Sequence, residues 1–151
     1  MSIRERVRTL FLSPREFYSP PEAAELLGFS QPELAKALKD GQLDGERTCS
    51  GYRIAWQEVA AMITAQYPQA TIEQALGNDI ASVMPEIVRL AELRVQIPRY
   101  EIVMLAKLAE RENLTVDEYV SRYLLDLAGA EVEWLSASVP QFAEAMRWPE
   151  T

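Results

Sequence analysis

The sequence predicts a mainly α-helical protein that carries one small hairpin and one further isolated strand. The helices are indicated by Ser or Thr residues followed three positions later by Glu, with apolar residues at helical spacing after them. The strands are indicated by a hairpin-like stretch at 42–54 and by strict apolar–polar alternation at 93–97. We therefore expect a mainly α fold in which connecting and C-terminal helices accompany these features.

Composition is that of a globular protein. The chain has 151 residues, of which 48% are hydrophobic and 25% are charged. No stretch approaches the roughly 20 apolar residues that span a bilayer, and the N-terminus lacks the apolar run of a signal peptide. The single cysteine, Cys49, cannot form an internal disulfide. We expect a cytoplasmic protein without membrane contact.

The composition argues against the commonest kinds of enzyme active site. The chain has no histidine and one cysteine, so it lacks the commonest general base and the usual zinc ligands. A carboxylate-based or lysine-based active site remains formally possible, but nothing in the sequence groups such residues. We expect no catalytic residues, no metal site, no cofactor and no enzymatic activity.

The stretch 19–41 predicts two short helices joined by a tight turn. Ser19 and Glu22 form a capping-box pair, and Gly28 stands where a left-handed residue ends a helix. Ser30 and Glu33 repeat the pair at the start of the second helix. This order is the helix-turn-helix pattern. Residues 3–12, which precede it, predict a short amphipathic helix or a basic arm.

A hairpin at 42–54 and a helix at 56–63 follow. The segments Ser-Pro-Pro-Glu-Ala-Ala-Glu-Leu-Leu-Gly (19–28), Lys-Asp-Gly-Gln-Leu (39–43) and Gly-Tyr-Arg-Ile (51–54) resemble the excisionase/MerR-type winged helix-turn-helix over about 18–63. The resemblance implies that the second helix enters the DNA major groove and that the hairpin wing touches the backbone or minor groove. The DNA-facing residues would be Gln31, Lys36 and Lys39 on the helix and Arg47 and Arg53 on the wing. The alternative is that these are ordinary solvated side chains.

Residues 64–92 predict a connector with structure of its own. Pro68 interrupts the chain, and 71–77 predicts a short helix. A second helix is expected from Ile80 to Ala91, with Pro85 near its first turn. The segment is too apolar for a flexible linker, so we expect it to pack.

Residues 93–129 predict a strand and two helices. The strand Leu93–Ile97 is followed by a helix at 99–111, a turn at Asn113, and a helix that Thr115 caps and that stops at Gly129. A lone strand cannot satisfy its edges, whereas two copies can pair. The order resembles the ribbon-helix-helix (CopG/Arc-like) family over about 93–128. The resemblance implies a homodimer through Leu93–Ile97, in which Arg94 and Gln96 face the major groove.

The expected organisation is an N-terminal arm and winged helix-turn-helix at 1–63, a connector at 64–92, a dimerisation module at 93–129 and an amphipathic tail at 130–151. The formal net charge is −8, which opposes DNA binding. We nevertheless expect a homodimeric DNA-binding protein, either a transcriptional regulator or an antitoxin-like autorepressor, whose partners are double-stranded DNA and a second copy. The alternative is a protein-interaction module, an antitoxin or adaptor, that binds a protein such as a toxin without strong DNA affinity.

Overall fold

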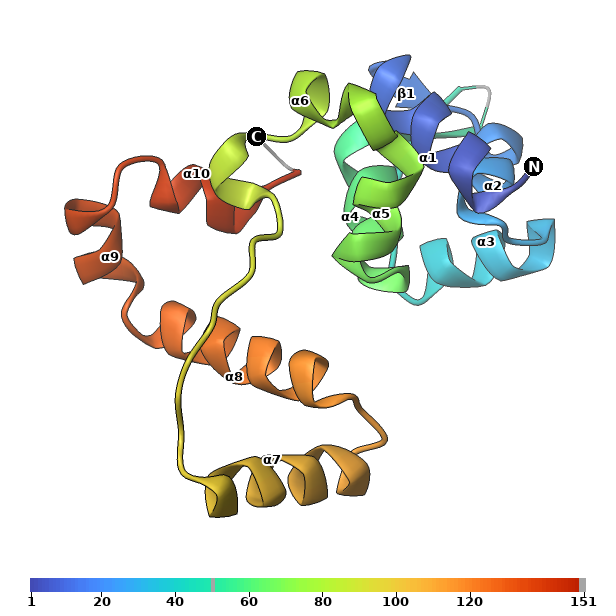
Figure 1. Ribbon diagram of the computed structural model, residues 1–151. Helices are drawn as coiled ribbons and strands as arrows, with labels where there is room; N and C mark the ends of the chain where they lie inside the picture. Colours follow the sequence, from blue (N-terminus) through green and yellow to red (C-terminus); the bar gives the residue numbers. More distant parts are fainter. Residues whose placement is uncertain (50, 150–151) are drawn as a thin grey trace. The chain divides into compact units, whose positions relative to one another are not determined.

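The computed structural model describes residues 1–49 and 51–149, and these fall into two units (Figure 1). The first unit holds residues 1–90 together with 147–149, and the second holds Ala91–Met146. The fold is mainly helical with a small three-stranded antiparallel sheet, so the predicted fold class is confirmed. The segments expected at 1–63 and 64–92 thus share one unit, up to residue 90.

The first unit is built on five helices. They are α1 (Ile3–Leu12), α2 (Pro20–Leu27), α3 (Gln31–Lys39), α4 (Trp56–Gln66) and α5 (Gln69–Leu76). Helix α1 packs against α2, α4 and α5, and α2 packs against α3 (Figure 1). Because Val7 and Leu10 are fully buried, α1 is part of the core and is not a free basic arm.

The sheet has the order β1-β3-β2. Its strands are β1 (Phe17–Tyr18), β2 (Glu46–Thr48) and β3 (Gly51–Ala55). The β2–β3 hairpin was predicted, whereas β1, which pairs antiparallel with β3, was not. Tyr18 lies opposite Ile54 in the register, and both side chains are buried, so the sheet closes over the core of the unit.

Side-chain caps set where the predicted helices begin. The capping boxes expected at Ser19, Ser30 and Thr115 are all present, and Ser2 adds a fourth at α1. At α3 the Ser30 backbone N–H donates to the Glu33 carboxylate over 2.7 Å, and the Glu33 N–H donates to Ser30 Oγ over 3.4 Å. Each cap satisfies backbone groups that have no partner within the helix.

The connector contributes to the core but does not form the second helix expected from Ile80 to Ala91. Only α6 (Ile80–Val83) and the 3-10 turn η2 (Glu86–Val88) form there, after the 3-10 turn η1 (Gly77–Asp79). Pro85 has no N–H to donate, and it forces the preceding Met84 into the extended region (φ −114°, ψ 119°). The helix therefore stops before Pro85, and Met84 turns into the core.

Aromatic side chains join the C-terminal end and the start of α4 to α1. The rings of Phe11 and Trp148 stack with centroids 5.5 Å apart, and Trp56 meets Phe11 edge-on. Trp56 Nε1 also donates a 2.8 Å hydrogen bond to the carbonyl of Leu10. The last described residues therefore belong to the core of the first unit.

The second unit is a helical hairpin with two short helices after it. Helices α7 (Arg99–Arg111) and α8 (Val116–Ala130) pack together, and α9 (Val132–Ser138) and α10 (Phe142–Arg147) follow. Asn113 adopts the expected left-handed conformation (φ 56°) in the α7–α8 turn. Helix α8 runs through Gly129, where the sequence predicted its end.

The strand expected at Leu93–Ile97 is not formed within the single chain. Residues 90–98 have no regular secondary structure, and the backbone of 93–97 pairs with no strand of the described chain (Figure 1). A strand needs a hydrogen-bonded neighbour. The described residues of this chain provide none.

Replacing Ser30 by Ala should lower the free energy of unfolding at pH 7 by about 1 kcal/mol, because α3 loses its N-cap. The Ser30 backbone N–H and hydroxyl hold the pKa of Glu33 below its usual value. This stabilisation is present above the ordinary glutamate pKa and is lost as the pH falls through the lowered value. Ser30→Ala should therefore lose less stability on acidification, as measured by urea unfolding across pH.

The matched control is Gln57→Ala, an exposed helical position in the same unit that caps nothing. It should stay within about 0.5 kcal/mol of the parent chain. Equal stability of Ser30→Ala and the parent at pH 7 would show that this cap contributes nothing.

Candidate functional site

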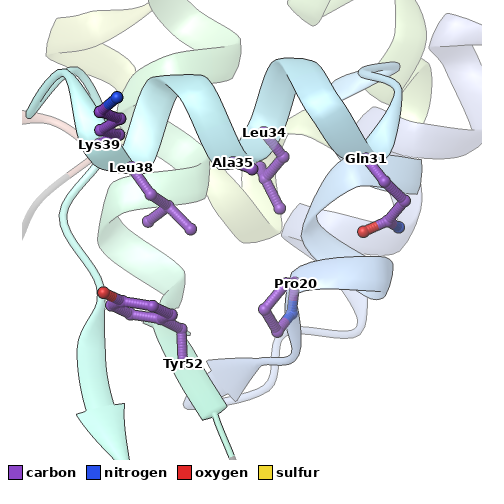
Figure 2. A pocket seen from close by; sticks show the side chains of 7 residues that line it. All are labelled: Pro20, Gln31, Leu34, Ala35, Leu38, Lys39 and Tyr52. Carbon is purple, nitrogen blue, oxygen red and sulfur yellow. The ribbon is translucent and has the colours of Figure 1, made fainter.

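A groove of about 290 Å³ lies between α3 and the β2–β3 hairpin (Figure 2). Its lining comes from the start of α2, one side of α3 and the second strand of the hairpin. The lining residues are Pro20, Gln31, Leu34, Ala35, Leu38, Lys39 and Tyr52. Five of these seven are apolar or aromatic, and the two polar ones stand at opposite ends of α3 (Figure 2).

The core decides which side of α3 faces the groove. Leu34 and Ala37 are buried beneath the helix. Gln31, Ala35 and Lys39 are spaced at i, i+4 and i+8, so they form one exposed stripe beside that buried side. The stripe brings two of the residues predicted to bind DNA to the same groove.

Strand register brings a third predicted residue near the groove. Arg47 lies directly opposite Tyr52 in the β2–β3 pairing, and residues opposite each other project from the same side of a sheet. Tyr52 lines the groove, so Arg47 lies on the groove side of the hairpin. Arg47 is exposed.

Arg53 projects from the other side of the hairpin, because side chains alternate along a strand. Its guanidinium lies 4.1 Å above the centre of the Phe17 ring, and its Nε donates to Glu46 over 2.7 Å. Arg53 thus holds β1 and β2 together and is separated from the groove.

Gly45 lets the hairpin approach α3 closely. A Cβ at this position would lie 2.9 Å from Leu38 Cδ2 and 3.4 Å from Tyr52 Cδ1. A larger residue would displace the Leu38 side chain. Gly45 therefore keeps two of the groove's apolar walls in place.

The cations around the groove are unpaired. Among the described residues, Lys36, Lys39 and Arg47 make no ion pair, whereas Arg53 and Arg94 each do. Lys36 follows Ala35 by one residue, so it projects about 100° around α3 from the stripe. The groove therefore has positive charge at the Lys39 end and on the wing, with Lys36 on the outer side of the helix.

Arg94 and Gln96 belong to the second unit, and both are exposed. Arg94 Nη2 lies 3.2 Å from Glu92 Oε2, with the two side chains 90% and 83% exposed. Such an exposed pair is worth little and leaves the guanidinium free to change partners.

The second unit leaves most of its apolar side chains in solvent. Only Ala109 and Tyr119 are buried among its described residues. Large apolar side chains are exposed on the 93–97 segment, on α7 and on α8. They are Leu93, Val95, Tyr100, Ile102, Val103, Met104, Val116, Tyr123, Leu124, Leu125 and Leu127.

Two further features are absent from the described residues. No group of three or more His, Cys, Asp or Glu side chains there could hold a metal ion. Within the same residues, no helix combines the length and the apolar character needed to cross a membrane.

Comparisons with models of protein families, with curated proteins and with solved structures found no match for this chain.

Sequence reasoning did not single out the apolar walls of the groove: Pro20, Ala35, Leu38 and Tyr52. One signal for Tyr52 was present, because alternation places it on the same side of the strand as the buried Ile54 and opposite to Arg53. The positions of Pro20 and Leu38 depend on how α2 and the hairpin pack, and no local pattern indicates that.

Proposed function

We propose that the protein is a homodimeric DNA-binding regulator that contacts the major groove with α3 and the adjoining side of the hairpin. The observation that carries this proposal is the groove flanked by Gln31, Lys39 and Arg47, whose polar groups have no partner within the described chain. An unpaired amide and unpaired cations beside an exposed helix suit base edges and phosphates. This role covers a transcriptional regulator and an antitoxin-like autorepressor.

The exposed apolar face of the second unit favours a second copy as partner. An apolar patch of this extent on an isolated chain marks an interaction site. The 93–97 segment alternates strictly and lacks a strand partner, and the same segment of a second copy offers a complementary edge. In such a dimer Arg94 and Gln96 would lie on the open side of the paired strands.

Dimerisation would raise the affinity for DNA in spite of the unfavourable net charge of −8 on each chain. Two weakly binding units on one duplex gain affinity from their linkage without any new contact. We therefore place the two α3 helices and the paired strands on one DNA site.

Lys39→Ala and Arg47→Ala should each weaken DNA binding and reduce its salt dependence. Each lost phosphate contact lowers the slope of log K against log salt by about 0.9. The measurement is a gel shift on randomised duplexes across a salt series, with the full chain.

Arg53→Ala serves as the control, because Arg53 is engaged with Glu46 and Phe17 on the other side of the hairpin. It should leave the salt slope unchanged. If the slope of log K against log salt fell in Arg53→Ala but not in Arg47→Ala, DNA would contact the side of the hairpin opposite to the groove.

Leu127→Lys should convert the dimer to a monomer in analytical ultracentrifugation. Leu127 extends the side of α8 that begins with the buried Tyr119, eight residues earlier. A lysine there would bury an unpaired charge in the dimer.

Leu125→Lys is a closely matched control. Leu125 and Leu127 are both 60% exposed in the single chain, but they are two residues apart and so about 200° apart around α8. Leu125→Lys should remain a dimer. Identical behaviour of the two variants would show that this side of α8 is not the interface.

A protein-interaction module is the second candidate. It is favoured by the acidic net charge and by the exposed apolar side chains of the second unit. If the chain dimerises but binds no DNA duplex even at low salt, the protein-interaction module replaces the DNA-binding regulator as the proposal. The next experiment is then affinity capture of a protein partner.

A further inference from the structure

We propose that the groove between α3 and the hairpin receives the 5-methyl groups of thymines, so that the protein selects A·T pairs. This inference rests on the proposed DNA binding and names the bases that the site reads. Pro20, Leu34, Ala35, Leu38 and the ring of Tyr52 give the groove an apolar floor (Figure 2).

An apolar floor is not what phosphate binding requires. Phosphates are held by cations, hydroxyls and backbone N–H groups. Among the groups that base pairs present in the major groove, the thymine methyl is the apolar one. The groove of about 290 Å³ is much larger than one methyl group, so it suits the edges of neighbouring thymines.

The polar ends of the groove agree with this assignment. The Gln31 side chain makes no hydrogen bond with other described residues, so its amide can donate and accept at once. A glutamine amide matches N6 and N7 of adenine, the base that pairs with thymine. Lys39, at the other end of α3, is placed for a phosphate.

The test modifies the DNA and leaves the protein intact. A duplex is selected from a randomised pool with the full chain, and each thymine is then replaced in turn by deoxyuridine, which lacks only the methyl group. We expect about a fourfold loss of affinity at one or more positions, the equivalent of one buried methyl-sized group. Comparing cytosine with 5-methylcytosine at a sensitive position should show a similar gain from the added methyl.

Tyr52→Ala tests whether the groove carries the effect. Tyr52 is 45% exposed, so its truncation spares the core. The deoxyuridine penalty should fall below about twofold, while the salt slope stays that of the parent chain. Ile87→Ala, an apolar position of similar exposure in the same unit but away from the groove, should keep the full penalty.

The outcomes separate the two proposals. If a duplex binds but no deoxyuridine lowers its affinity, or if Tyr52→Ala keeps the full penalty, the thymine assignment is wrong and DNA binding stands. If the chain binds no duplex at any salt concentration, both the DNA-binding proposal and the thymine assignment are wrong. The groove would then suit an apolar side chain of a protein partner.

Discussion

The burial of Leu34 and Ala37 beneath α3 fixes which side chains α3 presents on its outer side. With those two residues in the core, helical geometry leaves Gln31, Ala35 and Lys39 outward. The start of α3 depends in turn on Gly28, which has φ 71° and ends α2. The left-handed backbone angle at this position favours glycine, whereas a Cβ there would only displace the end of the Arg6 side chain. The groove is thus a product of the packing below it.

The two units differ in how much of their apolar surface is buried within a single chain. The first closes a core from five helices and a sheet, with fully buried side chains such as Leu10, Ile54 and Ile63. The second has one helical hairpin, two short helices after it and an unpaired segment, and these leave most of its apolar side chains exposed. Leu127 at 60% exposure belongs to a side of α8 that continues from the buried Tyr119. A second copy would extend the same burial, so dimerisation and the folding of this unit would be coupled.

Features set by local chemistry could be predicted from the sequence, and features set by tertiary pairing could not. The caps at Ser19, Ser30 and Thr115 and the left-handed Asn113 depend on residues within one turn of the chain. Strand β1 has two residues and exists only because β3 lies beside it. The stacking of Trp148 on Phe11 likewise joins residues from opposite ends of the chain. Two local signals were misread: Pro85, which ends a helix that was expected to continue, and Gly129, which lies within α8 and does not end it.

For the candidate site, the sequence indicated which polar residues to consider but not how they are grouped in space. The composition of α3 and the hairpin indicated Gln31, Lys36, Lys39, Arg47 and Arg53 as a set. Gln31 and Lys39 line the groove, and Arg47 lies on the groove side of the hairpin. Arg53 lies on the other side, where it contacts Glu46 and Phe17. A count of charges cannot distinguish Arg47 from Arg53. The alternation of side chains along the paired strands places them on opposite sides of the hairpin. The apolar floor of the groove depends on how α2 and the hairpin pack against α3, which a pattern of polar residues does not indicate.

The proposed DNA-contacting surface consists of α3 and the groove side of the hairpin. It can be tested by an amide NMR titration of the full chain with a selected duplex. The largest changes in chemical shift should fall within 31–39 and 46–53, with a second set at 93–97. Duplex binding that leaves 31–39 and 46–53 unshifted would show that another surface binds the DNA.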